Sequence, residues 1–376
     1  MKEFETYMAL VRAALWNEAL PEVEMSEEML QLIMRQGVGP LVFPKMPMTP
    51  MMKMVCVQNM QTQAKLQHTL VKAWEALTKA GIEPVLMKGA GLAVLYPEMQ
   101  LRAWGDIDLF VGKEQYHSAC KVMRDTFPGA LKFDEELDHY KHYNIIADGV
   151  SIETHRVTVG LQHPLDEKRY ARMEAYGTAH AEKLTVNGLE VKVFEPTFNA
   201  LFVFMHAWEH MLTAGANLRQ WCDLALLLHR YHERIDARLL ERWLKQLRLL
   251  DVWQLYAYNM LNGLGLPREE CLLYSERVAE RAERMLEDLL EGDRGKDEGR
   301  FATGRRKRLQ DNGEGLKVKG EGKKANRFVR KWGTMKERMK NAERIGQYSP
   351  EYARHMRAET LLHGALRLFA KDRRWE

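Results

Sequence analysis

Two aspartates separated by one residue, Asp106 and Asp108, are the side chains of this sequence with the clearest capacity for chemistry. They open residues 106–111, which alternate and then become apolar, as a partly buried strand does. Residues two apart in a strand project from one face, about 7 Å apart. Two carboxylates at that spacing repel each other unless a cation relieves the repulsion. Mg²⁺ suits such a site because it prefers carboxylate oxygens together with substrate phosphate.

A third acid is expected on another strand, and Glu153 is the best candidate. It lies in a predicted strand, with His155 next on the same face. Three acids can hold two divalent ions, which together stabilise the attacking and leaving oxygens of a phosphoryl displacement. The sequence therefore predicts Asp106, Asp108 and Glu153 as catalytic residues and metal ligands, with Mg²⁺ or Mn²⁺ as the ion.

A phosphate-binding element is predicted just before the two aspartates. Gly89 follows the short apolar run 84–87 and opens a short helix. Backbone N–H groups at a helix start can bind a triphosphate, and Lys88 could add positive charge there. Arg102 could orient Asp106 or a phosphate, or it could be an ordinary surface arginine. The sequence leaves both roles of Arg102 open.

In this order the elements resemble the polymerase-beta-like nucleotidyltransferases, and more closely the uncharacterised bacterial nucleotidyltransferase family. The residues that carry the closer resemblance are Lys88-Gly89, Tyr96-Pro97, Arg102, Asp106-Ile107-Asp108-Leu109, Ile152-Glu153-Thr154-His155 and the helical stretch 218–223. The resemblance covers roughly residues 30 to 260. It implies transfer of a nucleoside monophosphate from an NTP to an acceptor hydroxyl, with Lys88, Gly89, Arg102 and His155 at the nucleotide.

The acceptor is not readable from the sequence and could be a protein, an RNA or a small molecule. An alternative is a degenerate, non-catalytic protein that binds nucleotides or nucleic acid. Residues 301–340 hold 14 lysines and arginines against 4 acidic residues, a pattern typical of contact with nucleic-acid phosphates. A solvated loop and helix face is the simpler interpretation of that segment.

Two rival motifs need structural tests. Gly89-Ala90-Gly91, followed by acids, hints at a dinucleotide fingerprint, but Val94 stands at the third glycine position and Pro97 cuts the helix short. His206-Ala207-Trp208-Glu209-His210 matches the H-x-x-E-H pattern of some zinc proteases. No third zinc ligand is evident, so packed helix histidines are the simpler interpretation.

The elements that must position these residues predict an α+β protein, with a small mixed β-sheet of nucleotidyltransferase type flanked by N-terminal and C-terminal helical regions. Hairpins are expected at Asp148-Gly149 and Asn187-Gly188. The predicted domains are an N-terminal helical region 1–80, an α/β core 81–195, a helical region 196–292, a basic flexible loop 293–325 and C-terminal helices 326–376.

Composition agrees with a folded chain of ordinary character, because 46% of residues are hydrophobic and the net charge is +4. We find no apolar run near the roughly 20 residues that a membrane helix needs. The chain is therefore expected in the cytoplasm, without a membrane partner. The four cysteines are too far apart in sequence for a metal knuckle and are expected to be reduced.

Overall fold

The computed structural model describes residues 2–133, 137, 139–161, 164–212, 216–291, 339, 342–343 and 345–369. The N-terminal part is helical, as predicted, and comprises α1 (Lys2–Leu15), α2 (Glu27–Arg35), α3 (Gly39–Val42), η1 (Phe43–Lys45) and α4 (Pro50–Lys79). Side-chain caps determine where two of these helices begin. Ser26 accepts a hydrogen bond from the Met29 amide, and Thr49 accepts one from Met52. Pro50 stands at the first position of α4, where its missing N–H costs nothing.

The sheet has seven strands in the order β3-β4-β5-β2-β1-β7-β6. They are β1 (Val85–Leu86), β2 (Asp106–Phe110), β3 (Leu131–Lys132), β4 (His142–Ala147), β5 (Val150–His155), β6 (Glu182–Val186) and β7 (Leu189–Val193). It is a mixed sheet, because β2 pairs with β5 and β1 with β7 in parallel, whereas the other pairs are antiparallel. The mixed sheet that the sequence predicts for an α+β protein is therefore confirmed, with helical segments before and after it in the chain.

Both predicted hairpin turns are present. Asp148 and Gly149 have φ values of 51° and 78°, and Asn187 and Gly188 have values of 46° and 82°. Positive φ at both central residues is the geometry of the two-residue turn that matches the twist of paired strands. The first turn sets the register of β4 against β5, because it pairs Ala147 with Val150.

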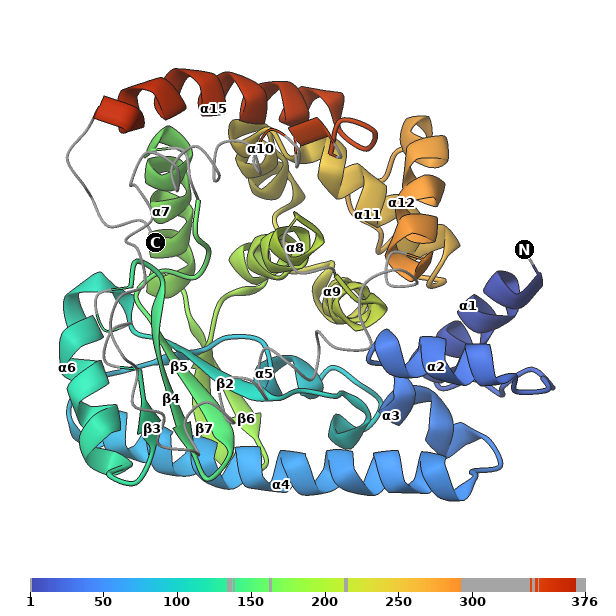
Figure 1. Ribbon diagram of the computed structural model, residues 1–376, viewed down its shortest axis with the longest axis horizontal. Helices are drawn as coiled ribbons and strands as arrows, with labels where there is room; N and C mark the ends of the chain where they lie inside the picture. The colour runs from blue at the N-terminus through green and yellow to red at the C-terminus, as the bar shows by residue number, and fades with distance from the viewer. Residues whose placement is uncertain are drawn as a thin grey trace, which may run out of the picture. The chain divides into compact units, whose positions relative to one another are not determined.

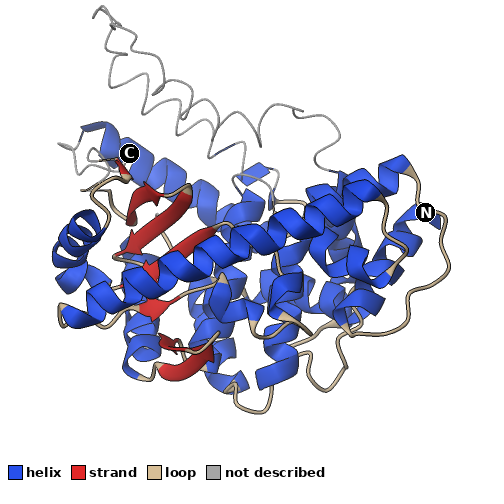
Figure 2. Cartoon of the chain, turned by 90° about the horizontal axis from the view of Figure 1, so that it is seen from below, coloured by secondary structure: helices blue, strands red, loops and turns tan. Residues whose placement is uncertain are grey.

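One face of the sheet is apolar and the other is polar around β2, β4 and β5. Ile107, Leu109, Tyr143, Ile145 and Ile152 are buried in one cluster with side chains of α4 and of α6 (Gly112–Thr126). Figure 1 shows α4 running along the sheet, and Figure 2, seen from the side of this helix, shows it lying across the strands. Since side chains alternate along a strand, the residues between the apolar ones point to the opposite face.

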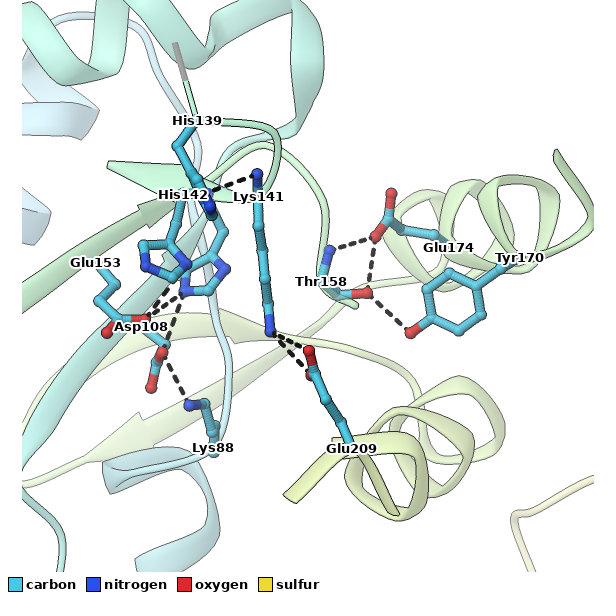
Figure 3. A network of polar contacts seen from close by, with 11 residues as sticks. Lys88, Asp108, His139, Lys141, His142, Glu153, Thr158, Tyr170, Glu174 and Glu209 are labelled. Atoms are coloured by element: carbon cyan, nitrogen blue, oxygen red, sulfur yellow. Dashed lines mark hydrogen bonds and ion pairs between the residues drawn. The ribbon is translucent and has the colours of Figure 1, made fainter. Parts of the chain in front are cut away.

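Along the chain, the other helices come between strands or after the last strand. They are α5 (Ala90–Ala93), η2 (Met99–Leu101), α7 (Pro164–Ala179), α8 (Pro196–Leu212), α9 (Leu218–Tyr231), α10 (Ala237–Leu247), α11 (Leu250–Asn262), η4 (Glu276–Val278), α12 (Ala279–Glu291) and α15 (Pro350–Phe369). The sequence patterns did not predict α7. A buried network holds this helix to the end of β5, since the amide and hydroxyl of Thr158 both donate to Glu174, at 2.7 Å each (Figure 3).

The chain divides into two compact units, one of residues 1–282 with 372–376 and one of residues 283–371. Within the second unit, Gln347 donates to Asp288 of α12. The predicted domain boundaries at residues 80, 195 and 292 stay predictions. The predicted basic loop 293–325 and most of the basic segment 301–340 lie outside the described residues. No helix within the described ranges is long and apolar enough to cross a membrane.

Candidate active site on the polar face of the sheet

The three predicted acids project from one face of two neighbouring parallel strands. Asp108 of β2 is directly opposite Glu153 of β5, and Asp106 is opposite Ser151. The register places all three carboxylates on the polar face, because Asp106 and Asp108 are two residues apart and Glu153 aligns with the second. Asp106 is half-buried, and its carboxylate has no hydrogen-bond or ion-pair partner among the described residues.

Asp108 is the buried centre of the site, with 2% of its surface exposed. Its Oδ1 atom lies 3.0 Å from Lys88 Nζ and 3.1 Å from His155 Nε2, whereas Oδ2 is buried without a hydrogen bond (Figure 3). Burial alone would raise the pKa of Asp108, but the charge of Lys88 and the hydrogen bond from His155 outweigh burial and lower this pKa. Asp108 is therefore ionised at neutral pH.

His155 links the two opposite acids. Its Nε2 atom is also 3.2 Å from Glu153 Oε2, so one N–H group lies within reach of both carboxylates. Burial works against the charged imidazole, but the hydrogen bonds to Asp108 and Glu153 raise the pKa of His155. Burial would likewise raise the pKa of Glu153, but the hydrogen bond from His155 and the neighbouring His142 lower it. The sequence predicted His155 at the nucleotide, and the structure places it between Asp108 and Glu153.

The strand β4 adds polar residues that the sequence analysis missed. His142 is the cross-strand partner of His155, and their ring centroids are 4.8 Å apart. Lys141 precedes β4 and forms an ion pair with Glu209 of α8 at 2.9 Å. The signal for His142 was in the sequence, since a two-residue turn at Asp148-Gly149 pairs residue 142 with residue 155 when the ladder is counted back.

Gly89 makes a tight turn between β1 and the acids. Its φ of 54° and ψ of −121° belong to a region that only glycine occupies readily. A Cβ atom there would lie 3.1 Å from the Trp104 ring. The helix that follows, α5, has a single turn, and the amides of Gly91 and Ala93 already donate to the carbonyls of Lys88 and Gly89. The triphosphate-binding role of Gly89 stays a prediction.

Replacing Gly89 with alanine is expected to lower the free energy of unfolding by about 1–3 kcal/mol, because the backbone strain of a non-glycine residue is of that order. Gly91→Ala is the matched control in the same turn, since a Cβ at Gly91 makes only ordinary contacts from 3.6 Å outward. That control should change stability by no more than about 1 kcal/mol. Thermal denaturation measures both, and equal melting temperatures for the two variants would contradict the strained turn.

Arg102 lies in a buried ion pair with Asp223. Burial opposes its charge, but Asp223 foremost and also the charge of Asp106 raise the pKa of Arg102. Arg102 is 3% exposed, so it is not a surface arginine. Its Nε and NH2 atoms each donate to one carboxylate oxygen of Asp223 on α9 at 2.7 Å, and Tyr96 donates to the same carboxylate at 2.8 Å. The NH1 atom of Arg102 is buried without a partner. Its role at the nucleotide stays a prediction, and its visible role is to join the chain before β2 to α9.

The two rival motifs do not form the sites that they suggest. The strand β1 pairs with β2 in antiparallel orientation, whereas a dinucleotide-binding unit has parallel strands on either side of its glycine-rich turn. His206 and His210 of α8 stack edge to face at 4.5 Å. Glu209 between them pairs with Lys141, and within the described ranges neither histidine joins a group of three or more possible metal ligands.

The acids fit a hard divalent ion. Within the described structure, neither the Asp106 carboxylate nor the Oδ2 atom of Asp108 has a hydrogen-bond partner. Glu153 is ionised beside them. Carboxylate oxygens together with substrate phosphate are the ligands that Mg²⁺ prefers. A second set of possible ligands overlaps the first, because ligand atoms of His142, Glu153 and His155 all lie within 4.8 Å of one another.

A mixed sheet that carries two aspartates spaced by one residue, with a third acid opposite on a parallel strand, is typical of nucleotidyltransferases. The chain belongs to the uncharacterised nucleotidyltransferase family, whose sequence model matches residues 25–260. A crystal structure of an antigenic nucleotidyltransferase-like protein from Paracoccidioides brasiliensis is also similar. At 15% identity and a TM-score of 0.32, it matches 52% of this chain and 91% of its own chain. No curated protein matches the chain.

Proposed function

We propose that this protein transfers a nucleoside monophosphate from an NTP to an acceptor hydroxyl, with a divalent ion of the Mg²⁺ or Mn²⁺ type. The observation that carries the proposal is the parallel register of β2 and β5, which puts Asp108 opposite Glu153 with Asp106 on the same face. Membership of the nucleotidyltransferase family supports the reaction class. In the reaction, the acceptor oxygen bonds to the α-phosphorus, the bond from that phosphorus to the bridging oxygen breaks, and pyrophosphate leaves.

Asp106, Asp108 and Glu153 would hold the divalent ion. When bound, such an ion neutralises charge on the phosphates and on the leaving oxygen. The carboxylates suit this role because those of Asp108 and Glu153 stay ionised well below neutral pH, as their lowered pKa values indicate. Asp106 is half-buried and without a partner among the described residues, so it can turn toward a ligand without breaking an existing contact.

Lys88 and His155 would work beside these acids. Burial tends to discharge Lys88, but Asp108 and its neighbouring acids keep the pKa of Lys88 above its usual value, so the ammonium is charged. A charged group with a partly exposed side chain at the edge of the acids can bind a phosphate oxygen. His155 can donate from Nε2 to either acid, which holds both carboxylates in place. The ionised Glu153 would favour removal of the proton from the acceptor hydroxyl.

Titration of the purified protein with each of the four NTPs, with and without Mg²⁺ or Mn²⁺, tests the proposal. We expect binding of at least one NTP that depends on the metal and disappears in the Asp106→Asn/Asp108→Asn double variant. Asp148→Asn is the matched control, because it removes one carboxylate from the β4–β5 turn and leaves the site intact. Binding that ignores both metal and substitution would contradict the proposal and favour the non-catalytic binding protein.

A further inference from the structure

The β4–β5 hairpin brings two imidazoles and a carboxylate to one point on the polar face. The ladder pairs His142 directly with His155 and Asn144 with Glu153. Opposite residues of an antiparallel pair have Cβ atoms about 5 Å apart, and a residue two positions along a strand shares the face. His142, His155 and Glu153 therefore converge because of the register, and all three residues belong to strands rather than loops.

The distances within this group are close to those of ligands around one ion, and all three ligand atoms lie within 4.8 Å of one another. His155 Nε2 is 3.2 Å from Glu153 Oε2, and His142 Nδ1 is 3.7 Å from the same oxygen. The second distance is too long for a hydrogen bond. Ligands bound at about 2.1 Å to a common ion lie roughly 3.0–3.5 Å from one another. Small side-chain rotations would bring all three atoms into that range.

The nitrogen of His142 that faces Glu153 has no hydrogen-bond partner in the described structure. Its Nδ1 atom is buried and accepts or donates no hydrogen bond. A buried polar atom without a partner is unfavourable, and a bound ion would satisfy it. A neutral imidazole has a lone pair to offer a metal.

We propose that His142, Glu153 and His155 bind a divalent transition metal ion of the Zn²⁺ and Co²⁺ class beside the Asp106–Asp108 pair. Two imidazole nitrogens and one carboxylate suit such ions, whereas Mg²⁺ favours an all-oxygen set. Three protein ligands leave coordination positions for water or substrate. Coordination through His155 Nε2 would replace the hydrogen bonds that this atom donates to Asp108 and Glu153. The alternative for the same side chains is the network seen here, in which protonated His155 bridges the two acids without an ion.

The inference goes beyond the proposed nucleotide chemistry and shares only Glu153 and His155 with it. The two sites are separable through the residues that they do not share. Asp106 belongs to the proposed nucleotide site and is not a member of the histidine group. His142 belongs to the histidine group and is not needed to hold Mg²⁺ with an NTP. Each proposal can therefore fail while the other stands.

The test is titration of the full-length, metal-free protein, freed of any polyhistidine tag, with Co²⁺ and Zn²⁺. Visible absorption of bound Co²⁺ reports nitrogen ligands, and calorimetry reports Zn²⁺ affinity. We expect saturable binding that His142→Ala weakens at least tenfold. Losses of about 10–100-fold in metal affinity are typical even when only a residue that orients a ligand is replaced. Glu153→Gln, which keeps the size of the side chain, should weaken binding similarly if His142→Ala fails to fold. Circular dichroism checks folding of each variant.

Two controls make the result specific. His117→Gln removes an exposed histidine of α6 and should keep full Co²⁺ binding. Asp106→Asn should also keep Co²⁺ binding while it loses Mg²⁺-dependent NTP binding. The histidine metal site would be overturned if excess Co²⁺ gave no absorption of bound metal. It would also be overturned if the wild type and folded His142→Ala bound Co²⁺ with equal affinity. NTP binding measured in parallel shows whether the nucleotide proposal fails with it.

Discussion

Asp223→Ala is expected to lower the free energy of unfolding by about 3–5 kcal/mol, since removing one partner of a buried ion pair leaves the other charge uncompensated. The pair qualifies because the side chains of Arg102 and Asp223 are only 4% and 5% exposed. Tyr96 would lose its acceptor in the same variant. At about 2–4 °C per kcal/mol for domains of 150–250 residues, the melting temperature should fall by roughly 10 °C. Chemical denaturation measures the change directly.

Asp251→Ala is the matched control for burial. Arg281 donates to both oxygens of Asp251 at 2.8 Å, so the two-point geometry resembles that of the first pair. These side chains are 28% and 26% exposed, and water can solvate what the substitution leaves behind. The expected loss is about 1 kcal/mol or less. Equal losses for Asp223→Ala and Asp251→Ala would show that burial does not decide the contribution of Asp223.

The double variant Arg102→Met/Asp223→Leu separates the stability of the pair from the function of Arg102. Replacing both charges with apolar side chains of similar volume should restore most of the stability lost in Asp223→Ala, because neither partner is left buried and charged. A restored variant that still binds the NTP would remove Arg102 from the predicted nucleotide-binding residues. A restored variant that no longer binds it would support the predicted role through the unpaired NH1 atom.

The common face of Asp106 and Asp108 could be predicted because strand periodicity acts over two residues, whereas the position of Glu153 opposite Asp108 depends on how two distant strands pair. The alternation along 106–111 and the turn at Asp148-Gly149 are local signals, and both strands form where these signals place them. The start of α4 is also set locally, because Thr49 caps it and Pro50 stands in its first turn. Local patterns are informative here since capping, turn geometry and side-chain direction depend on neighbours in the sequence.

The pairings between distant segments could not be predicted in this way. Arg102 and Asp223 are 121 residues apart, and nothing in either local pattern names the other as its partner. The place of β1 between β2 and β7 likewise depends on packing rather than on the two residues of that strand. The helix α7 escaped prediction because residues 164–179 mix polar and apolar side chains without a clear helical stripe.

The residues behind the family resemblance divide into two contact groups. Lys88, Asp108, Glu153 and His155 touch one another on the sheet, whereas Tyr96, Arg102 and Asp223 form the ion pair that joins the segment before β2 to α9. The second group lies outside the cluster of acids, and it fixes the segment that leads into β2 and therefore into Asp106. Hydrogen bonds from Asn59 and Gln63 of α4 to the carbonyls of Gln100 and Arg102 hold the same segment from the other side.

Asp106→Asn should slow nucleotidyl transfer strongly while the protein stays folded. The substitution keeps the size of a half-buried side chain that has no hydrogen-bond or ion-pair partner among the described residues, so stability should change by about 0.5 kcal/mol or less. A bound metal contributes several kcal/mol of charge stabilisation to a transferring phosphate, and loss of a ligand should slow the reaction roughly 10³-fold or more. Asp108→Asn is less informative, because Lys88 and His155 both depend on its carboxylate.

Transfer of label from α-³²P-labelled NTPs to the RNA, protein or small-molecule fraction of a cell extract measures the activity even while the acceptor is unidentified. Asp148→Asn is the control for loss of one negative charge, since Asp148 stands in the β4–β5 turn and outside the group of acids. Its labelling should match the wild type, whereas Asp106→Asn should label the acceptor far more slowly at an equal melting temperature. If Asp106→Asn labels its acceptor at the wild-type rate, the carboxylate of Asp106 does not hold the ion. Any metal would then be held by Asp108, Glu153 and the histidines of the β4–β5 hairpin.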